Sequence, residues 1–364
     1  MKIGTDQYNT FDTMTMDCWN DRVYYEGKEF PAGQFAAEIL NFAGVIHDPL
    51  LERITVLTAL VDDLSTAEKS KRHDIAAQLK PLLHDTVSWL YTCPPFCYCE
   101  SQGAYEDLEH ALSEERLDRD YEEREEHLPF MALSFCEPIL RILVAIYNFC
   151  LLIRAFEKKY LRGSKRRNAD AFAKAAHECF DEDDSFLILL EQMPFGGVEE
   201  FFSYPRVITG FKYFQDENNE EKWKTAQRVI CRRAIDFYVF DLMNGLHHGH
   251  APSQCQGCGR YFLTTNGHIP KYCDGVAPQD SRYTCRQYGA MKHQKEQNKQ
   301  HPVYRLFNTR TDTIRKHHWR GKISDELRQE ALCLAGNYRD KALMNNDYAA
   351  DGYARDMELE HIYA

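Results

Sequence analysis

The sequence predicts a mainly α-helical protein: a multi-helix N-terminal region followed by a small α+β, treble-clef-like zinc-binding module. Apolar residues recur at spacings of three or four through most of the first 250 residues, which is the helical period. A CxxC pair and two later cysteines follow in the C-terminal part, and thiolates are ligands that zinc takes tetrahedrally. A hydrophobic share of 44% and a charged share of 27% are those of an ordinary globular chain.

The 364 residues suggest several domains. We expect an N-terminal helical region, a helical core with short strands, a zinc-binding module with basic helices, and an acidic tail. Their expected bounds are 1–128, 129–250, 251–345 and 346–364.

The first 30 residues show no clear period apart from a short strand expected around Arg22–Tyr25. From Ala32 the pattern becomes helical, with apolar residues on one face at Phe35, Ile39, Phe42 and Ile46. The same period predicts two further helices, over Pro49–Leu64 and over His73–Trp89.

Two segments before residue 130 invite a metal-site interpretation. Cys93, Cys97 and Cys99 surround two prolines, but their spacing is unusual for zinc, so a buried, proline-stiffened turn is the favoured interpretation. Residues 106–127 are strongly acidic. A charge run of this length predicts a solvated helix, or a bridge between two helical layers, rather than a cation site.

The most apolar segment, residues 137–160, predicts the central helix of the core. Charged and polar residues interrupt it, and its uninterrupted middle is too short to cross a bilayer, so no membrane contact is expected. It leads into a basic loop that could touch phosphate, although a solvated connection is the simpler interpretation; its cations are Arg162, Lys165, Arg166 and Arg167.

Helix signals continue to the first cysteine. Asn168 or Asp170 can cap the next helix, and one or two short strands are expected in residues 194–215. Residues 220–246 then predict one amphipathic helix. It leads to three histidines that could bind metal but are simpler to explain as positive ends of the helix dipole: His247, His248 and His250.

The predicted metal ligands are Cys255, Cys258, Cys273 and Cys285, holding one structural Zn(II). Gly257, inside the first pair, and Gly259, directly after it, let the backbone turn its amides toward the sulfurs. A strand beginning at Tyr261 is expected to pack against a return strand at Tyr272, and the last cysteine is expected to open a helix.

Alternatives to four-cysteine zinc ligation remain open. The thiols could be unpaired core residues or a redox pair, and His268 or His293 could replace one of the cysteines. A redox pair would leave the third and fourth cysteines without a role, which favours metal binding.

The order CGRYF, KYC, CRQYGA, YRLF and RGKIS within residues 255–338 resembles an uncharacterised bacterial domain family of unknown function. The C-terminal module of that family is a zinc finger similar to the CGNR type. The resemblance implies metal binding by the same four cysteines and no established activity. Cys285 lacks the Gly-Asn-Arg that gives the CGNR finger its name.

Basic residues and one tryptophan follow the last cysteine, and Ser324 is expected to cap a final helix. Residues 251–345 carry 16 Lys/Arg against 8 Asp/Glu, whereas residues 1–250 carry 27 against 43. This asymmetry predicts a surface for a polyanion, or one that docks on acidic residues of the same chain. The candidate nucleic-acid contacts are Lys292, Lys295, Lys299, Arg310, Arg315, Lys316, Trp319 and Arg320.

The predicted function is that of a zinc-stabilised binding protein that contacts DNA or RNA. The alternatives are a protein–protein interaction module of a mobile-element or defence system, and a metal-dependent hydrolase or nuclease. No nucleotide-binding loop or catalytic motif occurs, so no catalytic residue is assigned. Thirteen cysteines and a polar start indicate a reducing, cytoplasmic setting with free thiols.

Overall fold

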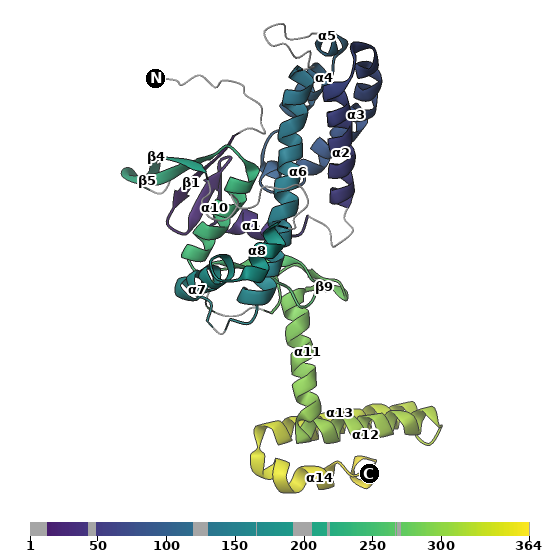
Figure 1. Cartoon of the computed structure of the whole chain (residues 1–364). Helices are drawn as coiled ribbons and strands as arrows, with labels where there is room; N and C mark the ends of the chain where they lie inside the picture. Colours follow the sequence, from purple (N-terminus) through teal and green to yellow (C-terminus); the bar gives the residue numbers. More distant parts are fainter. Residues whose placement is uncertain are drawn as a thin grey trace. The chain divides into compact units, whose positions relative to one another are not determined.

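The computed structural model of this chain describes residues 13–42, 49–118, 130–164, 166–191, 206–216, 219–265, 267 and 271–363. It contains two compact units, Met1–Lys271 and Tyr272–Ala364. Helices predominate in both, and small strands surround the cysteines, so the predicted fold class is confirmed (Figure 1). The expected division into four regions stays a prediction.

The helices of the first unit account for most of its described residues. They are α1 Gln34–Ile39, α2 Pro49–Thr66, α3 Lys69–Leu90, η1 Phe96–Tyr98, α4 Gln102–Ala111, α5 Glu114–Leu117, α6 Phe130–Phe156, η2 Glu157–Leu161, α7 Ala169–Phe180, α8 Asp184–Glu191 and α10 Ala234–His247. Its strands are β1 Met14–Trp19, β2 Arg22–Tyr25, β3 Lys28–Pro31, β4 Val207–Asp216, β5 Asn219–Cys231, β6 Ala251–Gln254 and β7 Tyr261–Thr264.

The predicted helices α2 and α3 are present, and α3 continues through Pro81. The helix expected from Ala32 is short, because α1 ends at Ile39. Part of the acidic segment forms two short helices, α4 and α5, instead of one solvated helix, with Leu108 and Leu117 buried. The rest of that segment, residues 119–129, lies outside the described residues.

Helix α6 is the apolar centre of the first unit, with α2 packed on one side and α10 on the other (Figure 1). It begins at Phe130, seven residues earlier than expected, and η2 continues it to Leu161. The segment Ala132–Leu161 is long and apolar enough to span a membrane by length and composition. An 18-residue stretch of it has mean hydropathy 2.0, but 61% of that stretch is buried inside the structure. Its side chains belong to the core, as the sequence predicted.

A five-stranded antiparallel sheet lies beside these helices, in the order β3-β2-β1-β5-β4. Strand β2 was predicted at its observed bounds, whereas β1 and β3 were not. The alternating apolar residues Met14, Met16 and Cys18 of β1 point into the core. Aromatic contacts hold α1 and α10 against this face, with the Tyr25 ring 5.5 Å from that of Phe35 and 5.6 Å from that of Phe237.

The prediction of one helix over residues 220–246 is wrong in its first half. Residues 219–231 form β5, which pairs with β1 on one side and β4 on the other, and only α10 is helical. The sequence NEEKWKTAQRVIC contains apolar residues at helical spacing, but as a strand it buries Ala226, Val229 and Cys231. Pairing on both edges gives the backbone N–H and C=O groups of β5 hydrogen-bond partners. This gain outweighs the weak local preference of the segment for a helix.

Helices α1 and α10 meet at two glycines. A Cβ on Gly245 would lie 2.8 Å from the Cα of Gly33, so neither helix can carry a side chain there. Asp241 of α10 accepts hydrogen bonds from the backbone N–H groups of Gly33 and Ala36, both at 2.9 Å, and thereby caps α1. Burial raises the pKa of Asp241 to about 7, although these amides favour the carboxylate.

The second unit contains a small hairpin followed by helices. Its elements are β8 Val276–Ala277, β9 Asp280–Thr284, α11 Cys285–Gln300, α12 Pro302–Trp319, α13 Asp325–Met344, η3 Tyr348–Gly352, α14 Tyr353–Asp356 and α15 Leu359–Ile362. Ser324 caps α13 as predicted, accepting a hydrogen bond from the Leu327 N–H at 3.2 Å.

The acidic C-terminal segment takes part in the core of the second unit. Its apolar residues Tyr353, Met357 and Ile362 are buried with alanines of α13. The Tyr353 hydroxyl donates to the Val303 carbonyl at 3.0 Å. The charges of this segment therefore remain outside while its apolar side chains fill the gap beside α12 and α13.

Candidate metal centre and basic surface

The first two cysteines occupy a tight turn between β6 and β7. These strands pair with each other, Gln254 opposite Tyr261, so the expected pairing of Tyr261 with a strand at Tyr272 is wrong. The Gly257 N–H donates to Cys255 Sγ at 3.3 Å, and the Gly259 N–H donates to the Cys255 carbonyl at 2.9 Å. Gly259 has φ +75°, which a glycine adopts without strain. The turn therefore directs an amide at a sulfur, as the sequence predicted.

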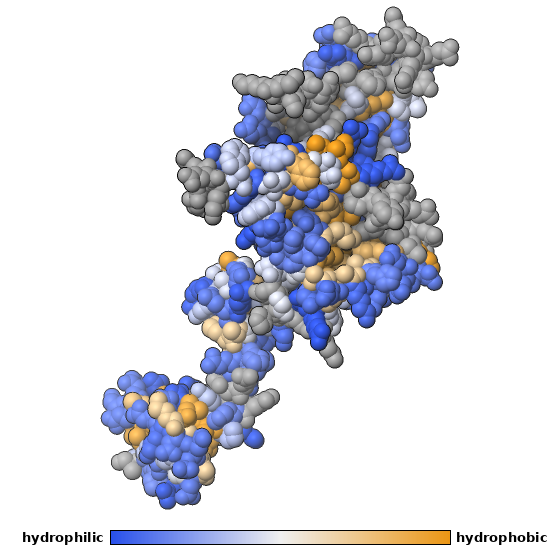
Figure 2. Space-filling view, turned by 90° about the vertical axis from the view of Figure 1, so that its left-hand side faces the viewer, coloured by the Kyte–Doolittle hydropathy of each residue, from blue (hydrophilic) through white to orange (hydrophobic). Residues whose placement is uncertain are grey.

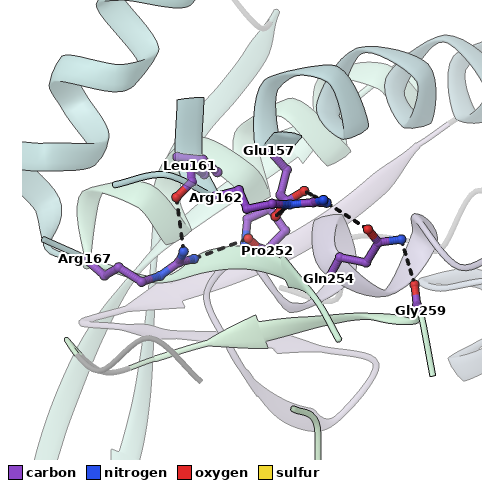
Figure 3. Close-up of polar contacts among 7 residues, drawn as sticks. All are labelled: Glu157, Leu161, Arg162, Arg167, Pro252, Gln254 and Gly259. Atoms are coloured by element: carbon purple, nitrogen blue, oxygen red, sulfur yellow. Dashed lines mark hydrogen bonds and ion pairs between the residues drawn. The ribbon is translucent and has the colours of Figure 1, made fainter. Parts of the chain in front are cut away.

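A chain of polar contacts supports this turn from η2 (Figure 3). Arg162 pairs with the buried carboxylate of Glu157 at 2.6 Å and also donates to Gln254 Oε1 at 2.8 Å. Gln254 in turn donates to the Gly259 carbonyl at 3.0 Å. The Glu157 side chain is only 1% exposed, so its charge is satisfied by Arg162 rather than by bulk water.

Arg167 holds the same hairpin at its other end. Its guanidinium is buried, donates to Thr264 Oγ1 at 3.1 Å, and reaches the carbonyls of Leu161 and Pro252 at 3.4 Å (Figure 3). Burial lowers its pKa from the usual value. The interpretation of residues 162–167 as a solvated or phosphate-binding loop is therefore wrong for Arg162 and Arg167, which bond within the fold. Lys165 lies outside the described residues.

The last two cysteines lie on either side of the hairpin formed by β8 and β9. Cys285 opens α11, as predicted, and its N–H donates to the Gly275 carbonyl at 2.7 Å. Thr284 and Gln287 cap the helix reciprocally, each accepting from the other's backbone N–H, at 3.2 and 3.0 Å. The sequence TCRQ carries this capping-box signature, which the sequence analysis missed.

The structure brings the four predicted cysteines together, with their sulfur atoms all within 4.8 Å of one another. A tetrahedral zinc site with Zn–S bonds of about 2.3 Å needs sulfurs about 3.8 Å apart, so small side-chain shifts suffice. Cys255, Cys273 and Cys285 are buried, and Cys258 is partly exposed. Four clustered sulfurs form a donor set for a thiophilic metal ion.

The other candidate ligands do not gather in this way. Within the described ranges, the four cysteines are the only group of three or more His, Cys, Asp or Glu residues placed to hold a metal. Cys99 Sγ instead lies 3.2 Å from the Tyr25 hydroxyl, and His250 Nδ1 lies 2.9 Å from the Ala32 carbonyl. His293 is outside the cluster, and His268 lies outside the described residues.

The candidate nucleic-acid contacts differ in exposure. Lys292 and Lys295 are exposed on α11, and the side chain of Lys299 is outside the described part of the chain. On α12, Arg310 is partly buried and Arg315 pairs with Asp312 at 3.3 Å. The remaining three, Lys316, Trp319 and Arg320, are exposed at the end of that helix. The face of the C-terminal helices in Figure 2 is mostly hydrophilic, with separate apolar patches.

The turn after α12 fixes the position of these residues. Gly321 has φ +66°, its N–H donates to the His318 carbonyl at 2.8 Å, and the Lys322 N–H donates to the His317 carbonyl at 2.9 Å. These two bonds are those of a Schellman motif, which ends the helix sharply. Trp319 therefore sits at a defined corner, and 85% of it is exposed. We call Lys316, Trp319, Arg320 and Lys322 the basic tip.

Comparison with known proteins identifies one similarity. Residues 203–364 match a family described as a family of unknown function (DUF6076). The matched segment includes the four clustered cysteines and the basic tip. Searches of curated proteins and of solved structures found no match. The C-terminal part of the chain is thus similar to an uncharacterised domain family, which assigns no activity to it.

Proposed function

We propose that the protein is a zinc-stabilised binding protein that contacts nucleic acid through the basic tip and the exposed lysines of α11, Lys292 and Lys295. The observation that carries the metal part of this proposal is the convergence of four sulfurs to within 4.8 Å. Two sulfurs from a knuckle-like turn and a third ligand at a helix start correspond to a treble-clef arrangement. Zn(II) suits this donor set because it takes four thiolates tetrahedrally and needs no redox change.

Zinc bound in this way would have a structural role. Four protein ligands leave no position for an activating water, so the ion would stabilise the fold rather than hydrolyse a substrate. None of the thirteen cysteines, all of which lie in the described ranges, forms a disulfide, which suits the reducing cytoplasm proposed for this protein.

Trp319 supports the nucleic-acid part of the proposal. A tryptophan that is 85% exposed and stands among Lys316, Arg320 and Lys322 offers a flat stacking surface within a positive field. Bases stack on such rings while lysine and arginine neutralise phosphates. Trp319 and its neighbours would thus favour an unpaired base beside a phosphate backbone.

The metal proposal is tested by elemental analysis of the full chain purified without added metal. We expect one zinc per chain, and loss of zinc from Cys258→Ser. Cys333→Ser is the matched control, since Cys333 is an exposed thiol outside the cluster. Zinc retained in full by Cys258→Ser, or no thiophilic metal in the unsubstituted chain, would contradict the proposal.

The nucleic-acid proposal is tested by titrating labelled single-stranded and duplex DNA and RNA over a salt series. The double variant Lys316→Glu, Arg320→Glu should bind more weakly and with a shallower salt dependence, by about 0.9 log unit per lost phosphate contact on duplex DNA. Lys71→Glu with Lys174→Glu is the charge-matched control, because both lysines are exposed on helices of the first unit. Equal binding by the two double variants would rule out the basic tip.

A further inference from the structure

A separate feature of the first unit is the uncovered end of its sheet. Strand β4 is the outermost strand, next to β5, and its residues from Ile208 to Tyr213 are exposed. Three aromatic side chains at this end are largely in solvent: Phe211 is 73% exposed, Tyr213 67% and Trp223 66%. We call these three residues the aromatic patch.

The strand register places the aromatic patch on the core face of the sheet. Phe211 is opposite Gln227, which is opposite Cys18 on β1, and Cys18 is buried in the core. Tyr213 lies opposite Thr225, and Trp223 lies opposite Gln215, two and four residues further along the same face. The core face therefore extends beyond the residues that the fold buries, and large aromatic residues occupy the extension.

Most of the β4 edge lacks the devices that normally protect an outer strand, since its register shift lies only at the far end, between Gln215 and Asp216. Proline residues and inward-pointing charges commonly prevent an edge strand from pairing with another chain, and β4 contains no proline. Its one lysine, Lys212, lies on the opposite face, where its Nζ binds Asp17 at 2.9 Å. A ten-residue outer strand that is exposed from Ile208 to Tyr213 and carries aromatic side chains is a template for pairing with another strand.

We propose that this edge pairs with the β4 edge of a second copy of the chain, forming a two-fold symmetric dimer with a continuous sheet. An antiparallel pair of identical edges places its two-fold axis through one residue, which then faces itself. An axis at Phe211 pairs Phe211 with its copy, Ile208 with the second copy's Phe214, and Lys212 with the second copy's Gly210. An axis at Lys212 would instead set the two lysines face to face, which is unfavourable.

The area available suits a dimer of ordinary size. Phe211 and Tyr213 lie on β4 itself, beside the second copy, whereas Trp223 lies on β5, one strand inward. At about 150–250 Å² for each aromatic side chain, the exposed parts of the two β4 rings offer at most about 280 Å² per copy. A standard interface buries about 800 Å² per partner. These two rings thus supply up to about a third, and the paired backbones of the two β4 strands, with Ile208 and Phe214 on the other face of the sheet, add further surface.

The test uses the full-length chain, measured by light scattering after size exclusion at about 50 μM, above the Kd of a micromolar dimer. We expect twice the chain mass of 42.5 kDa. Phe211→Glu and Phe211→Lys should each raise the Kd by roughly 30-fold or more and run at the single-chain mass. Val56→Glu, at an exposed apolar residue of α2, is the matched control and should remain dimeric.

Mixing the two charged variants distinguishes this pairing from misfolding. Because residue 211 faces its own copy, Glu and Lys at this position become partners, and an equimolar mixture should regain the dimer mass. Circular dichroism of each variant should match that of the unsubstituted chain. A single-chain mass for the unsubstituted protein, dimers formed by Phe211→Glu alone, or a mixture that stays at the single-chain mass would each overturn the proposal.

Discussion

The two compact units use charged residues differently. The first unit buries several charged side chains that bond to backbone or to each other: Asp17, Arg72, Glu157, Arg167, Asp236 and Asp241. In the described part of the second unit, Thr311 is the buried polar residue and every charged side chain is at least partly exposed. Its core instead contains alanines, such as Ala331 and Ala335, and a few larger side chains.

Two basic stretches, one in each unit, show this difference in how charged side chains are used. In sequence, RGSKRR of the first unit and RKHHWRGK of the second both look like phosphate-binding segments. In the structure, Arg162 and Arg167 bond to Glu157 and to the hairpin that carries the first two cysteines, whereas Lys316 and Arg320 point to solvent. A cluster of cations therefore indicates a binding surface only after its internal partners are known.

The largest effect on stability is expected for Arg167→Met. It removes a buried guanidinium that donates to the Pro252 carbonyl, the Leu161 carbonyl and Thr264 Oγ1, of which the Leu161 carbonyl keeps a hydrogen bond from the Ser164 N–H. The loss of these contacts should cost about 3 kcal/mol of unfolding free energy. Urea unfolding measures this loss. Arg320→Met, at an exposed position, should change the unfolding free energy by no more than about 0.5 kcal/mol. Equal losses in the two variants would show that the buried Arg167 stabilises the fold no more than the exposed Arg320 does.

A smaller loss is expected for Arg162→Met, about 2 kcal/mol, because the buried Glu157 carboxylate loses its partner while Arg162 itself is partly exposed. Adding Glu157→Met should recover part of this loss, since the unpaired charge is then gone. Urea unfolding of both single variants and the double variant gives the coupling energy. Strictly additive losses would show that the two side chains do not depend on each other.

Acidification should stabilise the first unit through Asp241. Its pKa is raised to about 7 by burial, above the ordinary value of 3.8, so the folded state binds the proton more tightly than the unfolded chain. This contribution is full below pH 4 and is lost as pH rises toward 7, at up to about 1.4 kcal/mol per pH unit. Asp241→Asn should flatten the unfolding free energy over pH 4–7; an unchanged profile would contradict the role of Asp241.

The smallest effect on stability is expected at the basic tip. Trp319→Ala should leave the melting temperature within about 1 °C, because the side chain is 85% exposed and packs little. Affinity for single-stranded nucleic acid should nevertheless fall by about 1–3 kcal/mol if bases stack on it. Thermal unfolding and a binding titration on the same preparation measure both. A large loss of stability would place Trp319 among structural residues instead.

Local signals predicted several features from the sequence. The spacing of Cys255, Cys258, Cys273 and Cys285 was sufficient to predict that these thiols converge, because turn glycines and a helix start constrain the chain nearby. The Ser324 cap and the central helix α6 were predicted for similar reasons, since each depends on residues a few positions apart.

Only the tertiary structure decided the features that depend on distant partners. Residues 219–231 became a strand because β1, some 200 positions earlier, pairs with them, and Arg167 became buried because Thr264 and Pro252 lie beside it. The sequence by itself determined the fold class and the cysteine cluster, which depend on short-range periodicity and spacing. Whether a cation or an aromatic side chain faces a partner or solvent depends on long-range packing. Only the structure therefore showed that Arg167 is buried and that Arg320 and the aromatic patch are exposed.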